Sequence, residues 1–235
     1  MQLFYNPYLD KDTQQVTFDK IESKHLIKVL RKKEGDLIYI TNGKGLLFIS
    51  RINIASDKKC LATIFKVEEK NNQRDYHLHV AIAPTKSIDR FEWFLEKATE
   101  IGIDEITPIL TNNSERKGIK KDRLEKIIQA AMKQSLKYHL PVLHEMTSFD
   151  DFLTAQKDKN VYIAHCNTGE KSLMKQVVKP NESIVLLIGP EGDFSLTEIE
   201  KALKAGCTEI TLGETRLRTE TAALVAVQNM AFINQ

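Results

Sequence analysis

The chain has 235 residues, of which 42% are hydrophobic and 28% charged, and its formal net charge is +2. This length allows a large core in one or two domains, and the composition is typical of a soluble globular protein. No apolar run approaches a membrane span, the first residues lack a signal-peptide pattern, and the three widely spaced cysteines fit no zinc motif, so we expect a reduced, cytoplasmic protein.

The first 70 residues are predicted to form a small domain of mostly β structure. Ser23–Arg31 has the apolar spacing of a short amphipathic helix. Asn42-Gly43 is a strong hairpin signal. Strands are expected at residues 37–41, 46–54 and 60–67. A meander of short strands with little helix predicts a small β-barrel, a fold that often binds nucleic acid.

A second domain is predicted over residues 71–235. Glu68–Arg74 contains no apolar residue and is expected to be the linker. Beyond it, apolar strands alternate with amphipathic helices. Strands are expected at 77–83, 106–110, 161–164, 184–188 and 209–212. Helices are expected at 89–101, from 122, from 148, at 196–205 and at 219–233. This alternation predicts an α/β domain with a mostly parallel sheet covered by helices.

Two glycine-containing loops follow strands of this sheet. The first, Gly189-Pro190-Glu191-Gly192, precedes a predicted capping box of Ser195 and Glu198. The second, Leu212–Ala222, carries Arg216 and Arg218 into a helix start. Because the carboxyl ends of parallel strands share one edge, both loops are expected to line one pocket. Arginines at a helix N-terminus suit a carboxylate or a phosphate, and surface ion pairs with nearby glutamates are the alternative.

Several common site motifs are absent from the sequence. It contains no dinucleotide-binding glycine fingerprint, no phosphate loop and no nucleophile elbow. His165-Cys166 could pair as base and nucleophile, but adjacent strand residues point to opposite faces. His139 and His144 flank Pro141, and no spacing makes them ligands. We therefore expect no metal site.

Two clusters of basic residues stand out in a chain that is nearly neutral overall. One spans residues 20–33 and the other residues 116–126. Together they suggest a surface that meets phosphates, with an ordinary solvated face as the alternative.

Several segments of the sequence, including both glycine-containing loops, resemble those of a known family. Ile188–Gly192 together with Leu217-Arg218-Thr219-Glu220-Thr221-Ala222 is similar to the paired motifs of the RsmE family. These are RNA methyltransferases of the SPOUT superfamily that form 3-methyluridine in 16S ribosomal RNA of the small subunit. The resemblance extends over almost the whole chain. One departure is Asp193, where the family usually has a glycine.

The resemblance implies a fold, a cofactor and partners. The C-terminal domain would be a SPOUT-type α/β domain with a trefoil knot, and the N-terminal domain a PUA-like RNA-binding β-barrel. The protein would be a homodimer, use S-adenosylmethionine and act on 16S rRNA or the small ribosomal subunit. The alternatives are a SPOUT methyltransferase acting on transfer RNA, a non-enzymatic ribosome assembly factor, and a doubly wound enzyme for a small phosphorylated metabolite.

If the resemblance holds, the chemistry of methyl transfer to uridine N3 and the charge clusters suggest roles for individual residues. Arg218 would stabilise the uracil anion, with Glu220 or Glu191 as the base. Cofactor binding is assigned to residues of the two loops and their surroundings: Thr111, Leu187, Ile188, Gly189, Pro190, Glu191, Gly192, Leu212, Gly213, Leu217 and Arg218. Four basic residues are expected to contact RNA phosphates: Lys24, Lys28, Arg31 and Arg116.

Overall fold

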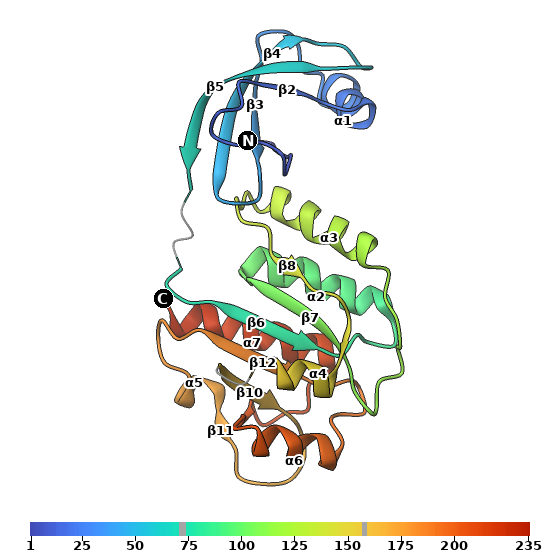
Figure 1. The fold of residues 1–235 in the computed structure, drawn as a ribbon, viewed down its shortest axis with the longest axis vertical. Coiled ribbons are helices and arrows are strands. Elements are labelled where there is room, and N and C mark those ends of the chain that lie inside the picture. Colours follow the sequence, from blue (N-terminus) through green and yellow to red (C-terminus); the bar gives the residue numbers. More distant parts are fainter. Residues whose placement is uncertain (71–73, 157–158) are drawn as a thin grey trace. The chain divides into compact units, whose positions relative to one another are not determined.

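The computed structural model describes residues 1–70, 74–156 and 159–235, which form two compact units (Figure 1). Unit 1 consists of Met1–Gln73 with Met132–Leu140, and unit 2 of Arg74–Ala131 with Pro141–Gln235. The segment Met132–Leu140 is held within unit 1 by backbone hydrogen bonds. Gly45 N–H donates to the Tyr138 carbonyl at 2.9 Å, and Leu140 N–H donates to that of Gly43 at 2.9 Å. Sequence reasoning, which ended the first domain at residue 70, did not anticipate this addition.

Unit 1 is built on a five-stranded sheet with the order β1-β3-β4-β5-β2. The strands are β1 Leu3–Tyr5, β2 Gln15–Thr17, β3 Leu37–Thr41, β4 Leu46–Ile54 and β5 Leu61–Glu69. The predicted hairpin joins β3 to β4, and both strands have the predicted bounds. Register shifts in the β4–β5 pair mark bulges, which bend a strand. The sheet encloses an apolar core that includes Phe4, Ile38, Ile40 and Phe48.

Two predictions for unit 1 were wrong in detail. The expected single helix at Ser23–Arg31 is instead α1, Lys20–Lys24, followed by a π-helical turn, η1, His25–Val29. In that turn the Leu30 N–H donates to the His25 carbonyl, a wider repeat that apolar spacing does not reveal. The predicted linker begins too early, because Glu68 and Glu69 belong to β5. Its residues 71–73 lie outside the described part of the chain.

Unit 2 contains a sheet in which every described strand pair is parallel, with the order β11-β13-β10-β12-β6-β7-β8 and β9 paired with β7. The strands are β6 Leu78–Ile82, β7 Glu105–Leu110, β8 Val142–Leu143, β9 Thr147–Ser148, β10 Asn160–Ala164, β11 Ser172–Leu173, β12 Ile184–Ile188 and β13 Thr208–Thr211. The central strands β6 and β12 are buried at every position, as their continuous apolar sequences predict.

Helices cover both faces of this sheet. The helices that follow β6 along the chain are α2 Ile88–Ile101, α3 Lys121–Gln134, α4 Phe149–Thr154, α5 Met174–Val177, α6 Leu196–Lys204 and α7 Thr219–Ile233. Phe149 and Phe152 of α4 and Ile199 of α6 share one core with alternate strand residues such as Ala81 and Leu187. Helix α7 packs against α2 and against β6 and β12. The predicted α/β class with a mostly parallel sheet is confirmed. None of the described helices has the length and apolarity that a membrane crossing requires.

Candidate active site

The loop after β12 is held by the predicted capping box at the start of α6. Ser195 Oγ accepts a hydrogen bond from the Glu198 N–H at 3.3 Å, and Glu198 Oε2 accepts one from the Ser195 N–H at 2.9 Å. A Cβ on Gly189 would lie 3.1 Å from the Phe194 ring and backbone. A larger residue at position 189 would therefore have to displace Phe194.

A neighbouring loop, after β7, is fastened to this helix start. Glu198 is buried, and its Oε1 accepts a hydrogen bond from the Asn112 N–H at 2.8 Å. Asn112 Nδ2 donates to Ser195 Oγ at 2.9 Å, and Asn113 Nδ2 donates to the Gly192 carbonyl at 3.1 Å. Glu198 thus serves two purposes, because it caps α6 and fixes the loop that follows β7.

The loop after β13 carries the two arginines that the sequence singled out. Gly213 has a φ of +151°, a conformation that favours glycine, and its missing Cβ would point into open space. Arg218 occupies the N-cap position of α7. Both Arg216 and Arg218 are exposed, and neither forms an ion pair with any residue that the structure describes. The alternative of ion pairs with Glu214 or Glu220 is therefore not what the structure shows.

These loops open onto one cavity of about 710 Å³ at the carboxyl edge of the sheet. Its wall comes from three loops, which follow β10, β12 and β13. Among the predicted residues, the lining includes Ile188, Gly189, Pro190, Glu191, Leu212, Gly213, Leu217 and Arg218. The structure therefore brings the two glycine-containing loops together, as parallel strands require.

Four of the residues predicted for catalysis or cofactor binding do not line this cavity: Thr111, Leu187, Gly192 and Glu220. Leu187 faces the apolar core with the α4 and α6 side chains. Thr111 is buried in the loop after β7, where its N–H donates to Ser114 Oγ at 3.0 Å. Gly192 lies beside Asn113, which a Cβ would approach to 3.1 Å.

The two glutamates proposed as bases have different surroundings. Glu191 lines the cavity, and its Oε1 accepts a hydrogen bond from the Lys86 N–H at 3.0 Å. Glu220 is buried in the first turn of α7, with Oε1 4.0 Å from Arg90 Nε on α2. Its Oε2 is buried and has no hydrogen-bond partner among the described residues. Glu220 thus faces α2, whereas Glu191 faces the cavity.

Sequence reasoning missed the third wall of the cavity, the loop after β10. The buried His165 bonds through Nε2 to Glu209 Oε1 at 2.8 Å, and Lys171 Nζ lies 3.4 Å from its Nδ1. Both ring nitrogens are engaged, so His165 is not placed to activate Cys166, which is exposed. The signal was available, because the sequence predicts a strand at residues 161–164 and the carboxyl ends of parallel strands share one edge.

The predicted RNA-contacting residues lie in different units. In unit 1, Lys24 and Arg31 are exposed, and Lys28 lies 3.5 Å from Asp57 in an exposed ion pair. Exposed pairs of this kind hold a side chain weakly. In unit 2, Arg116 donates to the carbonyls of Thr85 at 2.9 Å and Lys86 at 2.6 Å. Its guanidinium thus holds the β6–α2 connection in place shortly before α2 begins.

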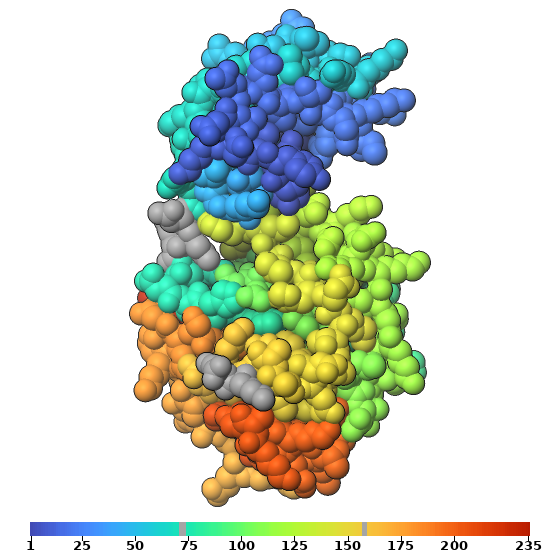
Figure 2. Space-filling view, in the orientation of Figure 1, coloured from blue at the N-terminus to red at the C-terminus, as the bar shows by residue number. Residues whose placement is uncertain are grey.

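A second basic surface is a groove of about 690 Å³ along the first turns of α3. Its lining includes Lys120, Lys121, Arg123 and Lys126. Lys121 pairs with Glu145 at 2.6 Å, and Arg123 pairs with Glu92 at 2.7 Å. The light-green part of the chain in Figure 2, which includes α3, lies at the molecular surface.

The RNA methyltransferase domain family matches residues 72–231, which include all the loops that line this cavity. This match places the chain in a class of RNA-modifying enzymes. The RNA methyltransferase PUA domain family matches residues 18–65, which confirms the predicted PUA-like unit. The chain belongs to the ribosomal RNA small subunit methyltransferase E family. It is 31% identical to the enzyme of that name from Buchnera aphidicola over 93% of this chain and 88% of the relative, and 28% identical to that from Bacillus subtilis over 90% and 87%.

Solved structures agree with this assignment. A probable rRNA methyltransferase from Porphyromonas gingivalis superposes with a TM-score of 0.92 and 37% identity, covering 100% of this chain and 98% of that one. The ribosomal RNA small subunit methyltransferase E of Neisseria gonorrhoeae, bound to S-adenosylmethionine, gives a TM-score of 0.89 and 26% identity, with coverage of 100% and 98%.

Proposed function

We propose that this protein transfers a methyl group from S-adenosylmethionine to N3 of a uridine in 16S ribosomal RNA. The observation that carries the proposal is the cavity at the carboxyl edge of the sheet. Two glycine-containing loops line it, and the exposed Arg218 stands beside it without an ion-pair partner among the described residues. The relatives named above supply the substrate class.

The cavity fits the proposed cofactor in size and in chemistry. Its volume of about 710 Å³ lies within the range of roughly 300–1,000 Å³ that is usual for small-ligand sites. Main-chain groups of Ile188, Gly189, Leu212, Gly213 and Leu217 are available to hold the adenine and ribose by hydrogen bonds. The open space beside Gly213 lets a ligand approach the backbone closely. When bound, S-adenosylmethionine supplies an electrophilic methyl group on a sulfonium.

Arg218 is proposed as the residue that stabilises charge on the uracil. N3 of uridine carries a proton at neutral pH, and its loss leaves negative charge on the ring carbonyl oxygens. An exposed guanidinium at the N-terminus of α7 adds its charge to that of the helix end and favours such an anion. The RNA must also present the base outside its stack.

We assign the general base to Glu191 rather than to Glu220. Glu191 lines the cavity, and one of its carboxylate oxygens is not used by the Lys86 N–H. Glu220 is turned toward Arg90 and is proposed to position the start of α7. A base must reach the proton that it removes, which favours the residue on the cavity wall.

RNA binding is proposed for the exposed basic residues of both units. Lys24, Lys28 and Arg31 would contact phosphates from unit 1, and the α3 groove would do so from unit 2. Arg116 would contact phosphates through the guanidinium N–H groups that do not donate to the carbonyls of Thr85 and Lys86.

The trefoil knot and a cytoplasmic location are part of this proposal, as the family resemblance implies. We also propose that the protein is a homodimer with α7 at the interface. Helix α7 has no charged residue from Thr221 to Ile233. Phe232 on this helix is 64% exposed, and Trp93 on the adjacent α2 is 43% exposed. A helix that is apolar all round is normally covered, and a second copy of the chain would cover it.

The decisive experiment is nucleoside analysis of ribosomal RNA from a strain that lacks this gene. Loss of 3-methyluridine, restored by the wild-type gene and not by Arg218→Ala, is the expected result. A modification lost from transfer RNA would support the transfer RNA alternative instead. If no nucleoside changes but small subunits assemble slowly, the chain is an assembly factor. Failure of the purified protein to bind S-adenosylmethionine would favour the metabolite enzyme.

A further inference from the structure

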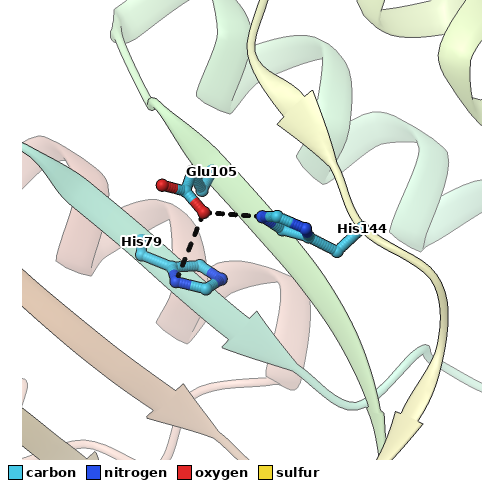
Figure 3. Close-up of side chains that lie close together, drawn as sticks. All are labelled: His79, Glu105 and His144. Carbon is cyan, nitrogen blue, oxygen red and sulfur yellow. Dashed lines mark hydrogen bonds and ion pairs between the residues drawn. The ribbon is translucent and has the colours of Figure 1, made fainter. Parts of the chain in front are cut away.

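A cluster of two histidines and a glutamate lies in unit 2 away from the cavity (Figure 3). His79 is on β6, Glu105 is the first residue of β7, and His144 directly follows β8. Glu105 Oε2 lies 2.6 Å from His144 Nε2 and 3.8 Å from His79 Nδ1. His79 and Glu105 stand near the amino ends of β6 and β7, and His144 follows the short strand β8, which pairs with the first two residues of β7, whereas the cavity lies at the carboxyl ends of β10, β12 and β13. The cluster is therefore a separate feature of the fold.

The decisive observation concerns the imidazole of His79. The residue is only 4% exposed, and its Nδ1 is buried without a hydrogen-bond partner among the described residues. Its other nitrogen, Nε2, lies 2.7 Å from Thr107 Oγ1. If Nε2–H donates to this hydroxyl, the lone pair of Nδ1 points at the Glu105 carboxylate (Figure 3). A hydrogen bond that fixes the tautomer in this way is typical of metal-binding histidines.

We propose that His79 Nδ1, Glu105 Oε2 and His144 Nε2 form a binding site for one divalent transition-metal ion, with Zn²⁺ as the best fit. The three ligand atoms all lie within 4.8 Å of one another. Two imidazole nitrogens and one carboxylate oxygen form a Zn²⁺ ligand set, whereas Mg²⁺ and Ca²⁺ prefer oxygen ligands alone. Water would occupy the fourth position. The ion takes the place of the proton that His144 Nε2 shares with Glu105, and that proton moves to His144 Nδ1 or to solvent.

The metal-free explanation accounts for only part of the cluster. Glu105 is also approached by His77, whose Nε2 lies 3.1 Å from Oε1, so the carboxylate could simply serve several histidines. That explanation satisfies His144 and His77 but leaves His79 Nδ1 buried without a hydrogen bond among the described residues, since its nearest charged neighbour, Glu105 Oε2, is 3.8 Å away, and a missing hydrogen bond is costly in an apolar interior. Phe152 packs its ring edge to face against His79 and closes one side. A bound ion would join β6, β7 and the segment after β8, so its expected role is structural.

The test is titration of the metal-stripped full-length protein with Zn²⁺ and Co²⁺. One ion per chain should bind, the visible absorption of Co²⁺ should saturate at that ratio, and Zn²⁺ should raise the melting temperature. Glu105→Gln and His144→Ala should each weaken Zn²⁺ binding by at least about 100-fold, since even losing an outer partner of a metal ligand costs about 10- to 100-fold. The matched control is His77→Ala, which removes a histidine bound to the same carboxylate and should change affinity less than about 3-fold.

Three outcomes would overturn the proposal. The first is the absence of any Co²⁺ absorption change and any Zn²⁺-dependent melting shift in the wild-type protein. The second is binding that persists in both Glu105→Gln and His144→Ala. The third is an equal loss in His77→Ala, which would indicate nonspecific binding to surface histidines. The wild-type Co²⁺ titration remains informative even if a variant does not fold.

Discussion

The backbone N–H of Cys166 donates a hydrogen bond to Oδ2 of Asp193 at 2.7 Å, which joins the loop after β10 to the loop after β12. Asp193 has a φ of +61°, in the left-handed region, and its Oδ1 accepts the N–H of Phe194 at 2.8 Å. Aspartate tolerates this conformation better than most residues because its side chain bonds locally. Asp193 thus keeps the turn and adds a hydrogen bond between two loops of the cavity wall.

Asp193→Gly is therefore expected to preserve the backbone but to loosen the cavity. Losing the bond to the Cys166 N–H should weaken S-adenosylmethionine binding by about 5- to 10-fold, or roughly 1 kcal/mol, as measured by calorimetric titration. Asp193→Asn, which keeps one acceptor oxygen, should fall between the wild type and Asp193→Gly. Wild-type affinity in Asp193→Gly would show that this bond does not support the cavity.

The residues of the cavity and those of the histidine cluster differ in how far the sequence could predict them. The loop after β12 follows from a continuous apolar strand that ends in glycine, the loop after β13 follows from a short strand and Gly213, and the capping box follows from Ser195 and Glu198. The loop after β10 could also be placed at this edge from its predicted strand, but only the structure shows that β10 lies between β12 and β13, which sets His165 beside Glu209. The cluster of His79, Glu105 and His144 was missed because its members are far apart in the chain and meet only through strand pairing.

Arg218→Ala should reduce the methylation rate by at least about 100-fold, the usual cost of removing one group that stabilises a developing anion. S-adenosylmethionine affinity should change little, because the cofactor is assigned to main-chain groups. The matched control is Arg216→Ala, since both arginines are exposed, line the cavity and lack ion pairs among the described residues. Equal losses in single-turnover rate for both variants would contradict a specific role for Arg218.

The three cysteines should differ sharply in their reaction with iodoacetamide at pH 8. Burial raises the pKa of Cys207 to about 11 and also raises that of Cys60, so both are almost entirely thiols at this pH and react slowly. Cys166 is exposed and lines the cavity. Mass spectrometry should find it alkylated first, and S-adenosylmethionine should slow that reaction. If saturating S-adenosylmethionine does not slow the alkylation of Cys166, the cofactor binds outside this cavity.

Glu198 should contribute more to stability than its place in a capping box alone would suggest. Glu198→Ala leaves the N–H groups of Asn112 and Ser195 without their acceptors, and we expect a loss of about 2–3 kcal/mol in the free energy of unfolding. Ser195→Ala should cost about 1 kcal/mol, as for a typical N-cap. Glu200→Ala, an exposed change on the same helix, is the control in denaturant titrations and should stay within about 0.5 kcal/mol of the wild type. Equal effects of Glu198→Ala and Glu200→Ala would contradict the dual role.

Lys28 and Arg31 are expected to bind RNA through its phosphates, because both are exposed and the Asp57 partner of Lys28 holds it weakly. Replacing both by alanine should weaken RNA binding most at low salt. It should also reduce the slope of log affinity against log salt by about 1.4–1.8, the value for two phosphate contacts on single- or double-stranded nucleic acid. Lys66→Ala, which removes a lysine already paired with Glu68 at 2.7 Å, is the control and should leave the slope nearly unchanged. An unaltered slope in the double variant would remove these two residues from the RNA-binding surface, whatever happens to affinity at a single salt concentration.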